Sequence, residues 1–465
     1  MGPSRPEQGP HGLPQAQVTL LEHPEEGEAM TPASRVHPRG DGRSSGLFDS
    51  AADGFAYTYV DQAQRLRALR EAALDAGYVS LGSRRTSSPH EFYRYPARFS
   101  PSFARAAIEA FTERGDLVLD PFVGGGTSVV EARIAGRLAV GSDLNPLAVL
   151  ISQVKAQPHS PSELSLVSRW VAQLPGALSV RGRLSHDEWT SSSYFRNIDS
   201  PELAGIRSAL IRALRSVDTI CSATGKSFAR CILLRAGQWA LDMRSETPTR
   251  AEFRDRLIDM AEAMVAAAHQ YRRDVRRADA TYESHGLRRT TIIKQAVSGL
   301  PERLGGRLPA PKLILTSPPY PGVYVNYHRW KVLGRRETPA PFWLANEVDG
   351  NGLSHYTMAA RSDPSLDRYF HHLEQGFADL ARLCNSETVI VQLVGFHDPN
   401  EGLSRYLAAM NRAGLVEFKV AEVGGDSPDG RLWRGVPNRR WWVQDGTRGI
   451  HTAQEVVLIH KKAPA

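Results

Sequence analysis

The chain has 465 residues, with 57 basic and 50 acidic side chains and a formal net charge of +7. It is longer than one average domain, and its modest basic excess suits a polyanionic partner. It has no apolar run of about 18 residues, no apolar signal segment at its start and only three widely spaced cysteines, which argues against membrane-spanning and disulfide-bonded secreted proteins. We expect a cytoplasmic location, no membrane association and, because no histidine cluster has metal spacing, no bound metal.

The N-terminal region divides into a tail and the beginning of a folded core. Residues 1–46 are rich in Pro, Gly, Arg, Glu and Ser and lack a hydrophobic period, which predicts a disordered tail. Residues 61–76 carry apolar side chains at helical spacing and predict an amphipathic helix. Residues 47–150 are therefore assigned to the first part of the core.

A glycine-rich turn is predicted between a strand and a helix at residues 117–127. The sequence there reads Leu-Val-Leu-Asp-Pro-Phe-Val-Gly-Gly-Gly-Thr, and the glycines allow positive φ and a close approach of the backbone to a ligand. A second strand is predicted at 138–141, and Asp143 follows it. A carboxylate at that position can accept hydrogen bonds from both hydroxyls of a ribose, or it can cap the next helix.

Residues 151–288 separate the second predicted strand from the third and are helical in pattern. Apolar side chains recur at helical spacing in 201–216, 226–242 and 251–278, and the last of these segments ends in pairs of arginines. Two interpretations stay open. The insertion contacts a nucleic-acid backbone or recognises the target, or it is a structural lid whose charges are solvated.

An apolar strand predicted at 313–315 leads into residues 316–320, which read Thr-Ser-Pro-Pro-Tyr. The two prolines make the turn stiff and remove backbone donors from it. The Ser317 hydroxyl and the Pro318 carbonyl could both accept from one NH₂ group, and Tyr320 offers a flat face for stacking. The turn thus has the groups needed to hold a nucleobase by its exocyclic amine. The alternative is an ordinary Pro-Pro loop that closes a strand.

Aromatic and cationic side chains are interleaved after this turn, in a pattern that suits stacking on bases and pairing with phosphates. The candidates for nucleic-acid contact are Tyr324, Tyr327, Arg329, Lys331, Arg335 and Arg336. A similar mix recurs at 431–442. The alternative for both stretches is a set of core aromatics with arginines that extend to solvent. Residues 387–394 and 454–460 predict further strands, and 289–465 is assigned to the second part of the core.

These motifs resemble those of the S-adenosylmethionine-dependent amino-methyltransferases of DNA. The Thr-Ser-Pro-Pro-Tyr turn resembles motif IV of that family, and the glycine-rich turn resembles motif I. Residues 90–99 contain Tyr-Pro-Ala-Arg-Phe and resemble motif X, with Arg98 where lysine is common. The resemblance implies an α/β fold, a Rossmann-like seven-stranded methyltransferase sheet with a helical insertion, whose last strand is antiparallel.

The resemblance also implies which residues form the site. The catalytic turn would consist of Ser317, Pro318, Pro319 and Tyr320, and the cofactor would be held by Asp120, Pro121, Phe122, Gly124, Gly126, Thr127, Asp143, Tyr95, Pro96 and Phe99. One stretch departs from the family pattern. Residues 294–296 read Lys-Gln-Ala where relatives often have Gly-Asp-Ala, so only Gln295 could replace the aspartate that commonly binds the cofactor adenine.

The reaction implied by the resemblance is methyl transfer from S-adenosylmethionine to the exocyclic amine of a base flipped out of double-stranded DNA, without a metal. Serine at position 317 is commoner among cytosine-N4 enzymes, which favours cytosine over adenine N6. Two other readings are an RNA base methyltransferase and a catalytically inactive nucleic-acid-binding module. The recognition sequence, and whether a restriction or defence-system partner accompanies the protein, stay open.

Overall fold

The structure is a computed structural model that describes residues 62–75, 88–95, 100–179, 193–244, 246–280, 289–321, 328–334, 336–349, 358, 365–396, 399–436 and 453–464. The chain divides into two units, Met1–Thr58 and Tyr59–Ala465, and all described residues belong to the second. The tail predicted at 1–46 lies outside the described residues. No helix within these ranges is long and apolar enough to cross a bilayer.

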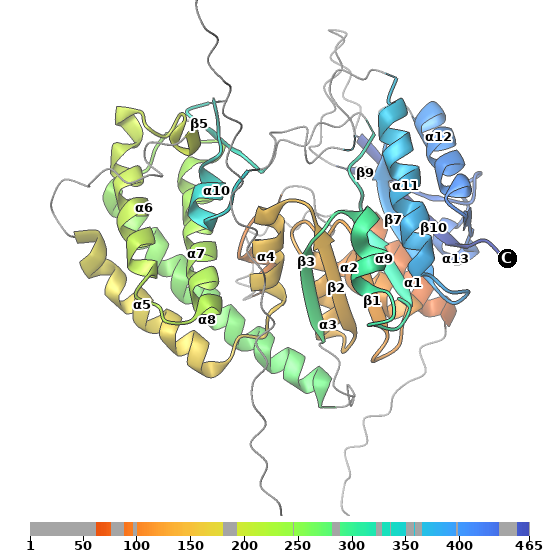
Figure 1. Cartoon of the computed structure of the whole chain (residues 1–465), viewed down its shortest axis with the longest axis horizontal. Coiled ribbons are helices and arrows are strands. Elements are labelled where there is room, and N and C mark those ends of the chain that lie inside the picture. The colour runs from red at the N-terminus through yellow and green to blue at the C-terminus, as the bar shows by residue number, and fades with distance from the viewer. Residues whose placement is uncertain are drawn as a thin grey trace, which may run out of the picture. The chain divides into compact units, whose positions relative to one another are not determined.

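A mixed sheet organises the described part of the chain (Figure 1), in the strand order β3-β2-β1-β4-β7-β10-β8, with β9 paired to β10 as an eighth strand. The strands are β1 Leu117–Asp120, β2 Leu138–Asp143, β3 Thr290–Lys294, β4 Leu313–Thr316, β7 Val389–Gly395, β8 Leu415–Glu417, β9 Leu432–Val436 and β10 Ala453–Lys462. The first five of these are parallel, and β10 is antiparallel to each of its neighbours. This topology confirms the predicted Rossmann-like α/β fold and the antiparallel last strand.

Helices cover both faces of the sheet because its central strands send alternate apolar side chains into two cores. The helices are α1 Gln62–Leu74, α2 Pro101–Phe111, α3 Thr127–Ile134, α9 Leu300–Leu304, α11 Asp367–Leu383 and α12 Pro399–Arg412. Val118 and Leu313 pack in a core that includes residues of α1, α2 and α3. Leu119 and Ile314 pack in the other core, with residues of α9, α11 and α12. The amphipathic helix predicted at 61–76 is confirmed by α1.

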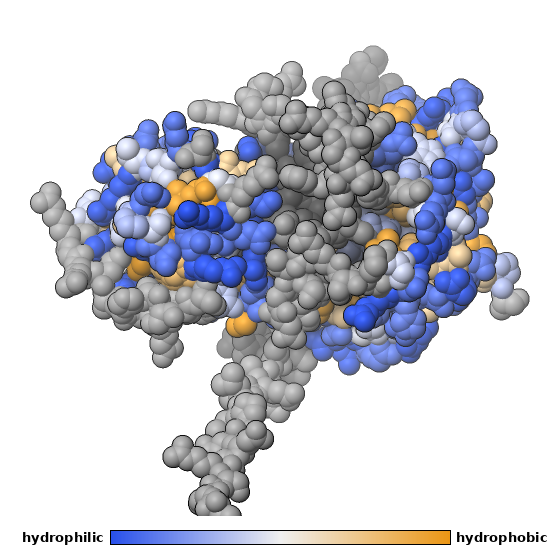
Figure 2. Space-filling model, turned by 90° about the horizontal axis from the view of Figure 1, so that it is seen from above, coloured by the Kyte–Doolittle hydropathy of each residue, from blue (hydrophilic) through white to orange (hydrophobic). Residues whose placement is uncertain are grey.

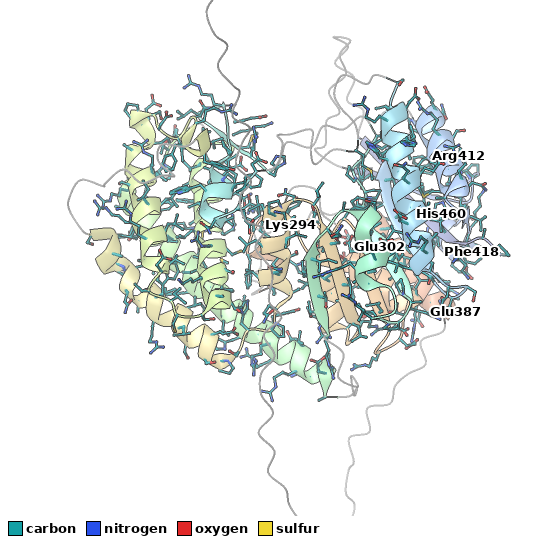
Figure 3. All side chains as sticks on the ribbon, viewed as in Figure 1. Lys294, Glu302, Glu387, Arg412, Phe418 and His460 are labelled. Atoms are coloured by element: carbon teal, nitrogen blue, oxygen red, sulfur yellow. The ribbon has the colours of Figure 1, made fainter. Side chains whose placement is uncertain are left out.

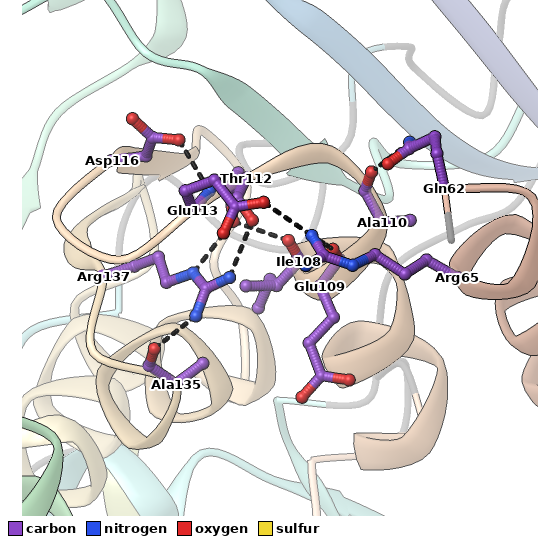
Figure 4. A network of polar contacts seen from close by, with 10 residues as sticks. All are labelled: Gln62, Arg65, Ile108, Glu109, Ala110, Thr112, Glu113, Asp116, Ala135 and Arg137. Atoms are coloured by element: carbon purple, nitrogen blue, oxygen red, sulfur yellow. Dashed lines mark hydrogen bonds and ion pairs between the residues drawn. The ribbon is translucent and has the colours of Figure 1, made fainter. Parts of the chain in front are cut away.

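A network of polar contacts lies at the N-terminal ends of β1 and β2 (Figure 4). The buried guanidinium of Arg137 donates to the hydroxyl of Thr112 (3.0 Å) and to its carbonyl (2.7 Å). Asp116 Oδ2 accepts the backbone N–H of Glu113 (2.7 Å), and Glu113 Oε1 lies 2.6 Å from Arg65 Nη1 of α1. This network fixes the turn between α2 and β1. Ligands of α/β sheets bind at the opposite end of the parallel strands, their carboxyl ends.

A helical cluster with its own apolar core is inserted between β2 and β3. Its helices are α4 Pro146–Ala156, α5 Pro161–Ser179, α6 Ala204–Val217, α7 Ala223–Leu241 and α8 Arg250–Asp279. The last three correspond to the three predicted helical segments, whereas the sequence pattern did not indicate α4 and α5. Nearly every residue of α4 is buried, so this helix has no polar face and no amphipathic period.

A later segment of the chain packs into the same helical cluster. It consists of the hairpin β5 (Trp330–Val332) and β6 (Arg336–Thr338), followed by α10 (Ala340–Ala345). Trp330 is fully buried, and a Cβ placed on Gly237 of α7 would lie 2.6 Å from its ring. The hairpin and α10 belong to residues 289–465, which were assigned from the sequence to the second part of the core, but they pack against the helical insertion.

The surface of the described residues, seen from above in Figure 2, is mostly hydrophilic, with hydrophobic residues in small patches. The large apolar side chains that are exposed in the described ranges are Leu74, Met243, Val348 and Phe418. Single exposed apolar side chains of this kind are normal on a folded protein.

Candidate active site

The turn between β1 and α3 depends on its glycines. Gly124 has φ +46° and Gly126 has φ +79°, both in the left-handed region that other residues rarely adopt. A Cβ on Gly125 would lie 2.7 Å from the Cβ of Tyr95, and one on Gly126 would lie 3.0 Å from the Cα of Ser152 in α4. The backbone of the three glycines therefore packs against Tyr95 and α4 and has no side chains that would keep a ligand away. A turn that contacts a ligand closely requires this.

We expect Gly126→Ala to lower the free energy of unfolding by about 1–2 kcal/mol, since alanine is strained at this φ and its methyl meets the α4 backbone. Gly176→Ala in α5 is the matched control. A Cβ there meets nothing within 4 Å, so helix propensity alone should leave stability unchanged or raise it by up to about 1 kcal/mol. Denaturant unfolding measures both, and equal stabilities of the two variants would contradict this account.

Asp120 ends β1 with a buried carboxylate that connects the two strands bearing the motifs. Its Oδ1 accepts from the Thr316 hydroxyl of β4 (2.8 Å) and from the Phe122 backbone N–H (3.1 Å), and its Oδ2 accepts from the Ser128 hydroxyl. Burial raises the pKa of Asp120 to about 6, although these hydrogen bonds lower it. Asp120 is thus engaged by protein donors and positions both turns.

Asp143 ends β2 beside the glycine turn. Its Oδ2 accepts the Gly124 N–H (2.9 Å), and its Oδ1 accepts the Asn145 N–H (2.8 Å). The cap of α4 is Asn145, whose side chain accepts from the Leu147 N–H (3.0 Å). Burial raises the pKa of Asp143 to about 6. An ionised carboxylate has about four acceptor sites, so capacity for a ligand's hydroxyls remains.

Residues 90–95, the described part of the motif X segment, are held by polar contacts to α4 and α7. Lys155 Nζ of α4 donates to the Tyr93 carbonyl (2.9 Å). Gln238 of α7 accepts the Arg94 N–H (3.1 Å) and donates to the Arg94 carbonyl (2.9 Å). Tyr95 is buried, and its side chain lies against the glycine turn. The two segments therefore form one surface.

The Thr-Ser-Pro-Pro-Tyr turn follows β4 at the same edge of the sheet as the glycine turn, because β1 and β4 are parallel neighbours. The Ser317 hydroxyl lies 2.9 Å from the Leu393 carbonyl of β7 and 3.3 Å from the Tyr320 hydroxyl. The Tyr320 hydroxyl donates to Glu455 Oε1 of β10 (2.8 Å). Ser317 and Tyr320 are half-buried, so their positions are fixed while part of each side chain is exposed.

Gln295 follows β3 at this same edge. Its backbone N–H donates to the Asp143 carbonyl (3.1 Å), and its carbonyl accepts the Ser142 hydroxyl (2.6 Å). Lys294, labelled in Figure 3, is exposed at the end of β3. The residue in place of the family's adenine-binding aspartate therefore lies one strand from Asp143. Of the other sequence-predicted residues, Pro121, Gly124, Gly126, Thr127 and Pro318 are buried, and Phe122 and Pro319 are half-buried.

The described part of the segment after residue 321 differs from the expected array of nucleic-acid contacts. Arg329 forms an ion pair with Asp349 (2.5 Å), and the two side chains are only 14% and 7% exposed. Its guanidinium thus pairs with a protein carboxylate in this structure, and its role as a phosphate contact stays a prediction. Lys331 is half-buried and Arg336 is exposed. Five predicted site residues lie outside the described residues: Pro96, Phe99, Tyr324, Tyr327 and Arg335.

Buried contacts that the sequence pattern did not indicate hold both turns. Tyr369 donates to the Pro319 carbonyl (2.7 Å). His90 Nε2 lies 2.7 Å from Glu131 Oε1, and Arg105 Nε donates to Glu131 Oε2 (2.8 Å). Burial raises the pKa of Glu131, but His90 and Arg105 outweigh it and hold that pKa below its usual range. No local motif connects these residues, so only their spatial neighbourhood identifies them.

Residues 75–154, which contain the glycine turn and Asp143, match the family described as DNA methylase. This segment is similar to the DNA methylase family. The chain is 38% identical over 79 residues to the type II methyltransferase M.MvaI of Kocuria varians, a match that covers 16% of this chain and 17% of that protein. It is 30% identical over 83 residues to M.MjaII of Methanocaldococcus jannaschii, covering 18% and 16%. The matches thus span about a sixth of these relatives.

Solved structures of the rRNA methyltransferase aviRa from Streptomyces viridochromogenes resemble the chain at 12% identity. The TM-scores are 0.29 and 0.30, and the match covers 80% and 81% of this chain and 89% and 94% of theirs. The DNA methylase match implies S-adenosylmethionine as the methyl donor.

Proposed function

We propose that this chain is a DNA methyltransferase that transfers the methyl group of S-adenosylmethionine to an exocyclic base amine, with cytosine N4 as the favoured target. The observation that carries the proposal is the connection between the two turns. The Thr316 hydroxyl donates to Asp120 Oδ1 (2.8 Å), so Ser317 begins the amine-binding turn beside the glycine turn of the methylase segment. Double-stranded DNA is the proposed partner.

The glycine turn and Asp143 suit the cofactor in shape and in chemistry. Gly124 and Gly126 would contact the methionine part, and the N-terminus of α3 at Thr127 favours its carboxylate. Asp143 would accept the ribose hydroxyls, and Gln295, which follows β3 next to Asp143, is the proposed acceptor for the adenine amine. When bound, S-adenosylmethionine supplies an already activated methyl group, so the protein contributes position and charge.

The catalytic turn would orient the target amine. Ser317 Oγ and the Pro318 carbonyl would accept the two N–H groups of the amine, which aims the nitrogen lone pair at the methyl carbon. Tyr320 would stack on the base. Because these groups cannot reach an amine within a stacked duplex, the base would have to be flipped out. The N–C bond would form as the sulfonium–methyl bond breaks, which leaves the cofactor as a thioether, and the nitrogen would lose one proton to water.

Cofactor affinity should fall as the pH falls through about 6, because burial raises the pKa of Asp143 to that value and protons then compete with the ribose hydroxyls. The loss should approach about tenfold per pH unit below 6. Calorimetry between about pH 5 and pH 8 measures it, and Asp143→Asn should bind weakly with a flatter profile. The sign for stability is opposite: a raised carboxyl pKa favours the folded state in acid, and this contribution disappears as the pH rises through 6.

The test of the proposed function is incubation of the purified protein with labelled S-adenosylmethionine and mixed genomic DNA, followed by mass spectrometry of the nucleosides. N4-methylcytosine is the expected product. N6-methyladenine would keep the enzyme class and change the target, since a serine hydroxyl accepts from either amine. Label in RNA but not in DNA would contradict the proposed substrate, and DNA binding without cofactor binding would indicate an inactive module.

A further inference from the structure

A buried ion pair lies behind the catalytic turn. Glu455 of β10 is opposite Arg434 of β9 in the strand register, and their side chains are 3% and 8% exposed. Arg434 Nε and Nη2 both donate to Glu455 Oε2, at 3.0 and 2.7 Å. The other carboxylate oxygen, Oε1, accepts the Tyr320 hydroxyl at 2.8 Å. The ion pair therefore reaches the catalytic turn through the hydrogen bond that the Tyr320 hydroxyl donates to Glu455.

The direction of the hydrogen bonds in this network follows from the chemistry of its ends. An ionised carboxylate only accepts, so the Tyr320 proton points to Glu455 and away from Ser317. A backbone carbonyl also only accepts, so the Leu393 carbonyl, 2.9 Å away, takes the Ser317 proton in preference to the Tyr320 oxygen at 3.3 Å. Both protons thus go to a carbonyl and a carboxylate, and neither occupies a lone pair of the Ser317 oxygen.

We propose that the Glu455–Arg434 pair is a positioning device that turns the Tyr320 proton away and so keeps the Ser317 oxygen an acceptor for the base amine. This inference rests on the proposed function. Without the device, the Tyr320 hydroxyl would donate to Ser317 and occupy a lone pair that the amine N–H requires. Glu455 is not a catalytic residue, because it acts only through Tyr320.

Glu455→Gln tests the direction of these bonds without changing their shape. Arg434 only donates, so the amide must turn its oxygen to Arg434 and its NH₂ group to Tyr320. The NH₂ group then donates to the Tyr320 oxygen, and the Tyr320 proton turns to Ser317. We expect kcat on DNA to fall at least about tenfold, with the calorimetric affinity for S-adenosylmethionine within about twofold of wild type.

The decisive measurement is the double variant Tyr320→Phe/Glu455→Gln. Phenylalanine keeps the stacking ring but has no proton to misdirect, so Glu455→Gln should have no further effect on kcat in the Tyr320→Phe background. The double variant should therefore match Tyr320→Phe and be faster than Glu455→Gln. A double variant as slow as Glu455→Gln, or slower, would show that Glu455 has only a structural role and would overturn the proposal. So would Glu455→Gln with wild-type kcat.

The Arg431–Glu417 pair supplies the matched control. Its atoms are 2.6 and 2.7 Å apart in a bidentate contact between the residue before β9 and the last residue of β8. The two side chains are 14% and 18% exposed. Glu417→Gln should leave kcat unchanged. If Glu455→Gln does not fold in a thermal melt, Tyr320→Phe still decides, since a loss as large as that of Ser317→Ala would overturn the proposal. A result that contradicts the proposed function is distinguishable from these outcomes, because the wild-type protein itself would then neither bind the cofactor nor produce a methylated nucleoside.

Discussion

Replacement of Ser317 by alanine should reduce the single-turnover rate on DNA about 100-fold or more and leave cofactor affinity nearly unchanged. The hydroxyl is the predicted acceptor that orients the amine, and removal of one such polar group from an active site costs about this much. It lies outside the glycine turn, so the cofactor contacts remain. Tyr320→Ala should have a similar effect, because it removes the stacking face. Rates by nucleoside mass spectrometry and affinities by calorimetry measure these effects.

Ser208→Ala is a suitable control, because that hydroxyl donates only locally, to the Gly205 carbonyl of α6 (3.0 Å). It should turn over at the wild-type rate. If Ser317→Ala or Tyr320→Ala methylated DNA at the wild-type rate, the motif IV assignment would be wrong. A rate that fell together with cofactor affinity would point instead to a disturbed fold.

Asp143→Ala should weaken binding of S-adenosylmethionine by at least about tenfold. The substitution removes the proposed ribose acceptor and also leaves the N–H groups of Gly124 and Asn145 without their partner, which loosens the glycine turn. Hydrogen bonds to a charged group contribute about 1.5–3 kcal/mol each, enough for a tenfold effect or more.

The control is Asp116→Ala at the opposite edge of the sheet, where the carboxylate likewise accepts a backbone N–H, that of Glu113 (2.7 Å, Figure 4). It should cost stability without changing cofactor affinity. Calorimetry at equal folded fraction, set by thermal melts, separates the two effects. An unchanged affinity in Asp143→Ala would refute the ribose role.

The parts of the fold that could be predicted are those whose signal is local. Short apolar runs that end in a glycine or proline turn predicted β1, β2 and β4 and placed the family motifs at the ends of these strands. The helix α4 has no such signal, since it is buried on nearly all sides and its apolar residues therefore do not recur with an amphipathic period. The ion pair between Arg329 and Asp349 could not be predicted either, because the local sequence around an arginine is the same whether it binds a phosphate or a protein carboxylate.

Contacts around the candidate site were beyond a sequence reading for a different reason. Tyr320 and Glu455 are 135 residues apart, and they meet only because β10 pairs with β7, which itself pairs with β4. Residue type alone would place a glutamate in a strand on the solvated face. Its burial follows from the arginine opposite, so the strand pairing must be known before the ion pair can be recognised.

The hydrogen bonds between Gln238 and both backbone groups of Arg94 have a mechanical consequence. They fasten α7 of the helical cluster to the strand of chain whose next residue, Tyr95, forms one wall of the glycine turn. A displacement of α7 therefore also displaces that wall. A molecule that bound the helical cluster and displaced α7 would change the affinity of the turn for its ligand. By thermodynamic reciprocity, the ligand would change the affinity of the cluster for that molecule by the same factor.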